Sequence, residues 1–175
     1  MKKISSPFWK SHLDDLRHVK TFEDASIIPV DVLRGMPLLK NKPLTELCGP
    51  ISSGGYNNYE KNMLFFKECI SFASELGFYM FDQTPLELGF IPLKREWEEK
   101  NPGQYCWPIL NVVYEAIFTS GYIKQGLFLP NWESSIGSRW ERKRMEELGI
   151  QIIDFSPRLF ELVKKQFEKK YKEVA

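Results

Sequence analysis

The sequence has few of the residues on which several common kinds of site depend. It holds two histidines, His12 and His18, and three cysteines, Cys48, Cys69 and Cys106. The cysteines lie far apart in apolar or helical contexts, which favours buried free thiols in a reducing compartment over disulfides or a zinc site. A histidine-dependent mechanism and a histidine-rich metal site are equally disfavoured. We therefore expect no metal, no cofactor and a cytoplasmic location.

An excess of charge of either sign is also missing. The 24 basic and 23 acidic residues give a net charge of +1, which offers no electrostatic case for a nucleic-acid polymer or an anionic membrane surface. No apolar run approaches the roughly 18 residues that span a bilayer. Aromatic residues, in contrast, make up 14% of the chain, which suits a well-packed core or a pocket that stacks a flat ligand.

Apolar runs and turn residues predict alternating strands and helices over most of the chain. The expected strands are 44–48, 78–81, 126–129 and 150–153, and the expected helices are 58–77, 108–119, 137–149 and a last one from 157, with a helical insert within 86–103. The charged run 94–100 in this insert is typical of a solvated helical turn, with a mobile lid as the alternative. This order favours an α/β fold, a doubly wound, flavodoxin-like three-layer sandwich with a parallel sheet of four to five strands.

Residues 1–42 show no clear periodicity. Pro29 interrupts a short apolar segment there, and Gly35, Pro37 and Pro43 break up the residues after that segment. We interpret 1–42 as an N-terminal extension that wraps the domain or a neighbouring subunit, and 43–175 as the α/β domain.

Two polar loops follow expected strands. In open parallel sheets, ligands bind beyond the carboxyl ends of the strands. The first loop offers backbone N–H groups and hydroxyls to an anion, and its residues are Gly49, Ser52, Ser53, Gly54 and Gly55. A plain turn and a phosphate- or sugar-binding loop are both compatible with it. Asp82 directly follows the second strand and is either a site residue or the cap of a turn.

The second loop leads to a carboxylate. Its candidate binding residues are Trp132, Ser134, Ser135, Gly137 and Ser138, and Glu141 follows in the first turn of the expected helix. Glu141 is compatible with a solvated helix face. Beside hydroxyls and tryptophans, it also suits attack on the anomeric carbon of a sugar.

The segment Leu129-Pro-Asn-Trp-Glu-Ser-Ser-Ile-Gly-Ser-Arg-Trp-Glu141 resembles the Leu-Pro-Gly-Trp-x-x-Ser-x-Gly-Ala-x-x-Glu signature of the nucleoside 2-deoxyribosyltransferase-like superfamily, in particular its small, often phage-borne members, which are related to the nucleoside-5′-monophosphate N-glycosidases. Gly49-Pro-Ile-Ser52 resembles the first loop of that family, and Leu76-Gly77 resembles the segment before its second strand. The resemblance covers about residues 44–153.

The resemblance implies cleavage or transfer at the N-glycosidic bond of a nucleoside or nucleoside 5′-monophosphate, with Glu141 as the nucleophile. It implies that Ser135 contacts a 5′-phosphate, and residues 52–55 would form the other half of a phosphate cradle. It also implies a homodimer.

One family feature is absent. The aspartate expected before the Leu-Pro motif, which assists protonation of the leaving base, is not found in residues 121–125. Asp82 or Glu115 could replace it. A catalytically inactive nucleotide-binding or nucleotide-sensing module of the same fold therefore stays open as the alternative function.

Overall fold

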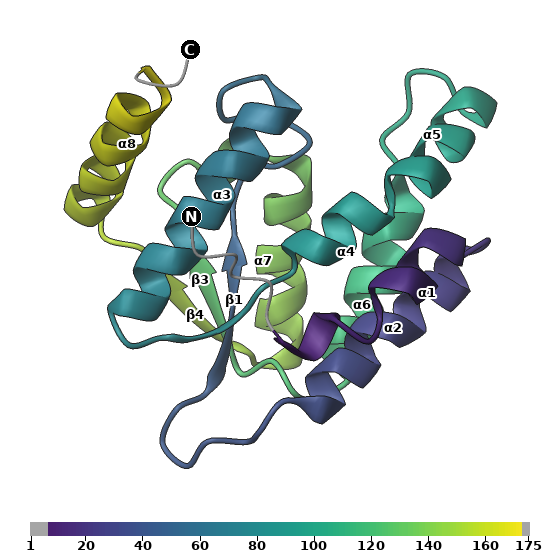
Figure 1. Ribbon diagram of the computed structural model, residues 1–175, viewed down its shortest axis with the longest axis horizontal. Helices are drawn as coiled ribbons and strands as arrows, with labels where there is room; N and C mark the ends of the chain where they lie inside the picture. Colours follow the sequence, from purple (N-terminus) through teal and green to yellow (C-terminus); the bar gives the residue numbers. More distant parts are fainter. Residues whose placement is uncertain (1–6, 173–175) are drawn as a thin grey trace.

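A four-stranded parallel sheet forms the centre of the computed structural model, which describes residues 7–172 (Figure 1). The strands are β1 (Leu44–Cys48), β2 (Tyr79–Phe81), β3 (Gln125–Phe128) and β4 (Gln151–Asp154), in the order β2-β1-β3-β4. Each strand begins and ends within one residue of the predicted stretch. The predicted α/β class with a parallel sheet is thereby confirmed.

Helices precede, connect and follow the strands. They are α1 (Leu13–His18), α2 (Phe22–Gly35), α3 (Tyr59–Glu75), α4 (Thr84–Gly89), α5 (Ile91–Lys100), the π-helical η2 (Ile109–Tyr114), α6 (Glu115–Thr119), α7 (Ile136–Leu148) and α8 (Pro157–Lys172), with short 3₁₀ turns η1 (Pro7–Trp9) and η3 (Trp132–Ser134). As predicted, α7 ends at Gly149 in the left-handed conformation. None of the helices described within residues 7–172 has the length and apolar character needed to cross a membrane.

Successive side chains of a strand point to opposite faces of the sheet, and they belong to two separate hydrophobic clusters. Leu47 and Leu127 belong to a cluster with apolar residues of α3 and α8. Cys48 and Phe128 belong to the other cluster, which also contains residues of α2, α4, η2, α6 and α7. Because Glu46 alternates with Leu47 along β1, its side chain lies on the same side of the sheet as Cys48.

The N-terminal segment contributes to the second cluster. Ala25, Ile28 and Val32 of α2 are buried there, and α2 packs against η2 and α6. Pro29 lies inside this helix rather than breaking it, although it has no N–H to donate to the preceding turn. The predicted interruption at Pro29 was therefore wrong. Residues 1–6 of the expected extension and 173–175 of the expected domain lie outside the described residues.

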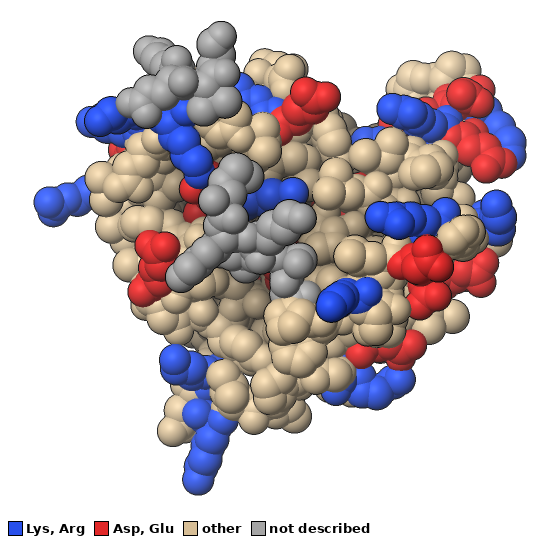
Figure 2. Space-filling view, in the orientation of Figure 1, with Lys and Arg blue, Asp and Glu red and all other residues tan. Residues whose placement is uncertain are grey.

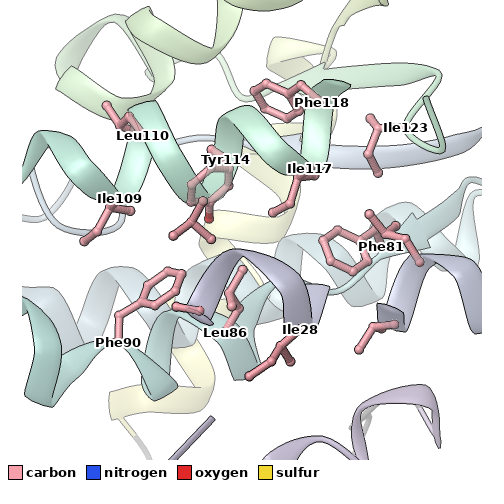
Figure 3. Close-up of a cluster of buried hydrophobic side chains, with 14 of the residues drawn as sticks. Ile28, Phe81, Leu86, Phe90, Ile109, Leu110, Tyr114, Ile117, Phe118 and Ile123 are labelled. Atoms are coloured by element: carbon pink, nitrogen blue, oxygen red, sulfur yellow. The ribbon is translucent and has the colours of Figure 1, made fainter. Parts of the chain in front are cut away.

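Helices α4 and α5 form the insert between β2 and η2. The charged run predicted there lies on α5, where Glu96 and Lys100 form an exposed ion pair at 2.7 Å. Basic and acidic side chains are interspersed over the face of the molecule shown in Figure 2. The insert therefore combines a solvated outer surface with buried residues such as Leu86 and Phe90, which Figure 3 shows facing η2 and α6.

Candidate functional site

The two polar loops meet beyond the carboxyl ends of β1 and β3. In the order β2-β1-β3-β4, the chain goes from β1 to β2 on one side and then returns to β3 on the other side of β1. The loops after β1 and β3 therefore flank the topological switch point of the sheet. The Gly55 amide donates to Ser134 Oγ at 3.2 Å, and the Ile136 amide donates to Ser53 Oγ at 3.0 Å. Gly54 has a positive φ of 73°, and a Cβ there would lie 2.4 Å from the Ser134 carbonyl oxygen. Only glycine fits this contact.

These bonds define the roles of four predicted binding residues. The hydroxyls of Ser53 and Ser134 are already engaged in tying the loops together, and Gly54 and Gly55 form the contact surface. We refer to this set as the loop clasp. It shapes the site: both hydroxyls accept a hydrogen bond across the clasp, and the Ser134 hydroxyl also donates to the Asn131 carbonyl oxygen at 2.7 Å.

A cavity of about 40 Å³, which has room for a few water molecules, opens beside the loop clasp. Six of the predicted residues line it: Gly49, Ser52, Ser135, Gly137, Ser138 and Glu141. Ser135 also caps α7, since its Oγ accepts a hydrogen bond from the Ser138 amide at 3.2 Å. The sequence thus located one wall of this cavity.

Glu141 is the buried carboxylate of that wall. Helix α7 starts at Ile136, so Glu141 lies in its second turn rather than its first, and its side chain is 7% exposed. Burial, assisted by the negative charge of Glu87, raises the pKa of Glu141 to about 8, while the nearby Cys48 thiol and Ser138 hydroxyl oppose this shift. A carboxyl with this pKa exchanges its proton near neutral pH.

Asp82 and Trp132 take other positions. The Asp82 carboxylate accepts hydrogen bonds from the amide and hydroxyl of Thr84, at 3.0 and 2.6 Å, and so holds the start of α4. It is absent from the residues that line the cavity. Trp132 packs its ring edge-on against Phe128 and lies 4.7 Å from the Arg142 guanidinium. Both side chains make contacts with neighbouring residues, and neither is among the residues that line the cavity.

The opposite wall of the cavity comes from the insert and from η2, which sequence reasoning did not assign to the site. It includes Glu87, Lys94, Tyr105, Cys106, Ile109, Leu110 and Tyr114. The Tyr114 hydroxyl donates to Glu87 Oε1 at 2.5 Å. Burial raises the pKa of Glu87, and the Tyr114 hydrogen bond and the Lys94 charge oppose that effect. The sequence does contain a feature that could have pointed to Glu87. It is the single charged residue within the apolar run Leu86-Glu-Leu-Gly-Phe-Ile, which is typical of a buried carboxyl.

The π-helical geometry of η2 lies within the predicted helix 108–119. A π-helical turn contains an extra residue, and such turns occur frequently at functional sites. Figure 3 shows Tyr114 between η2 and the side chains of the insert. Glu115, the next residue, instead binds Arg144 at 2.5 Å, which removes it as the replacement acid.

A third glutamate lies deeper in the sheet. Glu46 is completely buried, and neither of its carboxyl oxygens has a hydrogen-bond partner among the described residues. Burial, with the charges of Glu141 and Glu87, raises the pKa of Glu46 well above its ordinary value. Because an unpaired buried carboxylate is very costly, Glu46 is the neutral acid of the group.

Metal ligation has no visible basis in the part of the chain that the structure describes, residues 7–172, where no three His, Cys, Asp or Glu side chains are grouped to hold an ion. The polar groups of the cavity are carboxyls, hydroxyls, the Cys106 thiol and the Lys94 ammonium, beside apolar side chains such as Ile109 and Leu110. Comparison with known proteins adds no assignment: no family model matches this chain, and no curated protein or solved structure matches it.

Proposed function

We propose that the protein cleaves or transfers the N-glycosidic bond of a nucleoside or nucleoside 5′-monophosphate, with Glu141 as the glutamate nucleophile. Glu141 attacks the anomeric carbon in its ionised form, and the glycosyl group then passes to water or to a second base. The resemblance to the nucleoside 2-deoxyribosyltransferase-like superfamily belongs to this proposal. The proposal also includes a flavodoxin-like three-layer arrangement and a homodimer. The strand order and the two core clusters support the three-layer arrangement.

One observation supports the proposal above all others. A nearly buried carboxylate, Glu141, lines a cavity at the switch point of a parallel sheet, the position where such folds bind their ligands. Beside a buried group such as Glu141, a developing positive charge on the sugar is stabilised by the carboxylate far better than in water.

At about 40 Å³ the cavity has room for the reacting group and not for a whole nucleoside, so the proposal requires the substrate to extend through the open side of the cavity. The residues around the cavity offer groups for the rest of the substrate. Ser52 and Ser135 supply hydroxyls, and Tyr105 and Tyr114 supply aromatic surface for a base. Lys94 is the one cation in the lining as far as the described part of the chain goes. A 5′-phosphate, if present, is neutralised by Lys94 and by the N-terminal end of α7.

The test is a panel of ribo- and deoxyribonucleosides and their 5′-monophosphates, with free base measured by chromatography. We expect release from at least one compound by the wild-type protein and none from Glu141→Gln. Glu146→Gln, which changes an exposed glutamate of the same helix, is the matched control. Absence of release across the panel would refute the proposal.

The alternative, a nucleotide-binding or nucleotide-sensing module without turnover, is favoured by one observation. With a pKa of about 8, most of Glu141 is protonated at neutral pH, and a protonated carboxyl is a poor nucleophile. This alternative predicts thermal stabilisation by a nucleotide that persists in Glu141→Gln, with no product formed.

A further inference from the structure

The proposed reaction needs a proton donor for the leaving base. The two candidates that the sequence suggested, Asp82 and Glu115, are not among the residues that line the cavity. Asp82 holds the start of α4, and Glu115 is paired with Arg144. Among residues 7–172, Glu87 is the one carboxyl besides Glu141 that lines the cavity. It comes from the insert, on the wall opposite α7.

Glu87 is held in place by its neighbours. The Tyr114 hydroxyl binds Oε1 at 2.5 Å, and Tyr114 is itself 2% exposed, fixed by the core around η2 and α6 (Figure 3). A carboxyl that is anchored at one oxygen and lines a cavity has the fixed geometry that proton transfer requires.

We propose that Glu87 is the second catalytic carboxyl of this site, which protonates the leaving base and then takes a proton from the attacking water. This inference rests on the proposed function, because it assigns a role within that reaction.

The steps balance with one proton on the Glu87–Glu141 pair. The Glu141 carboxylate forms a bond to the anomeric carbon, the bond from that carbon to the base breaks, its electron pair moves to the base, and Glu87 gives its proton to the base. Water then attacks the anomeric carbon of the glycosyl ester. Glu87 accepts the proton of this water, and Glu141 leaves as a carboxylate, which restores the starting state.

The surrounding charges allow the pair to hold a single proton. Burial raises the pKa of both carboxyls; Glu141 also feels the negative charge of Glu87, while the Tyr114 hydrogen bond and the Lys94 charge oppose the shift of Glu87. The reactive form is the one in which the single proton lies on Glu87 and Glu141 is ionised. Burial also raises the pKa of the other titratable groups around the pair and keeps them neutral: Glu46 and Cys48 on β1, Tyr59 on α3, and Tyr105 and Cys106 before η2. The pair therefore titrates as a unit, and its two macroscopic pKa values bound the active pH range.

The experiment compares leaving groups that need a proton with one that does not. We expect Glu87→Gln to lower kcat/KM for the nucleoside that wild type cleaves by about 10²–10⁴-fold, the usual contribution of a general acid. On the 4-nitrophenyl glycoside of the same sugar, whose phenolate leaves unprotonated, Glu87→Gln should keep a rate within about tenfold of wild type. Glu141→Gln should lose both reactions.

The pH profile gives a second readout. With the nucleoside, wild-type kcat/KM should fall at high pH as the pair loses its last proton, and with the nitrophenyl glycoside this alkaline fall should disappear. Glu96→Gln, an exposed glutamate on α5, is the control and should behave as wild type. Equal loss of both substrates in Glu87→Gln, or no loss of either, would overturn the assignment.

A titration separates this inference from the proposed function. In protein labelled with ¹³C at glutamate carboxyls, Glu87→Gln should lower the pKa of Glu141, whether or not any substrate is turned over. An unchanged Glu141 pKa would contradict the coupled pair. If the pKa falls and yet wild type cleaves neither the nucleoside panel nor nitrophenyl glycosides, the pair exists, but the proposed function and the role of Glu87 in it are wrong.

Discussion

Replacing Glu141 by glutamine should stabilise the fold at neutral pH, although it should abolish activity. The pKa of Glu141 is raised to about 8 in the folded protein, against an ordinary value of 4.5. Below pH 4.5 the carboxyl is protonated in both the folded and the unfolded chain. As the pH rises from 4.5 through 8, the unfolded chain ionises and the folded one does not, so stability is lost over this window.

The size of the effect can be worked out from the same values. At pH 7 the unfolded carboxyl is about 2.5 pH units above its pKa, and each unit corresponds to about 1.4 kcal/mol. Glu141 therefore lowers the free energy of unfolding by up to about 3 kcal/mol at pH 7. Glutamine has a similar shape and no charge, and it removes this penalty.

Urea denaturation of wild type and Glu141→Gln at pH 4.5 and pH 7 measures the effect. The difference in free energy of unfolding should be small at pH 4.5 and should grow in favour of the variant by about 2–3 kcal/mol at pH 7. The exposed Glu146→Gln should stay within about 0.5 kcal/mol of wild type at both pH values. A difference that does not change with pH would show that Glu141 titrates normally and would refute the reasoning.

Three further changes test other parts of the site. Lys94→Met should raise KM for a nucleoside monophosphate by about tenfold or more in steady-state kinetics, with little change for the nucleoside, because only the former has a phosphate to pair; equal changes for both substrates would contradict a phosphate contact. Gly54→Ala should lower the free energy of unfolding by about 1–3 kcal/mol in urea, because alanine is strained at this positive φ and its Cβ meets the Ser134 carbonyl. Asp82→Ala should lower the free energy of unfolding by about 1 kcal/mol, because the hydrogen bonds to Thr84 are lost. We expect the folded variant to release base at or near the wild-type rate, which would establish a structural role for Asp82. Loss of base release in the folded variant would instead assign Asp82 to catalysis.

Sequence patterns predicted the sheet and one wall of the site well, because both depend on local signals. Strand β1, helix α7 and the left-handed Gly149 follow from apolar periodicity and capping preferences. The carboxyl ends of β1 and β3 must lie together in any parallel sheet of this order. That order is known from the structure. From the sequence, only the family resemblance placed the Gly49 and Ser135 loops beside one another.

The other wall depends on tertiary packing. Glu87 lies on a six-residue helix, and its function is visible only once Tyr114 is seen to reach it from η2. A π-helical turn has no sequence signature of its own, so the direction of Tyr114 could not be predicted from a regular helical pattern. Asp82 shows the opposite error: its position at a strand end suggested a site residue, but its carboxylate accepts hydrogen bonds from Thr84 at the start of α4.

Base release from the nucleoside and nucleotide panel tests the central claim most directly. Wild-type protein, Glu141→Gln and Glu146→Gln are incubated with each compound, and free base is measured by chromatography at pH 6, 7 and 8. The proposal predicts that wild type and Glu146→Gln release base from at least one compound and that Glu141→Gln releases none. Absence of free base from every compound, or release by Glu141→Gln at the wild-type rate, would contradict it.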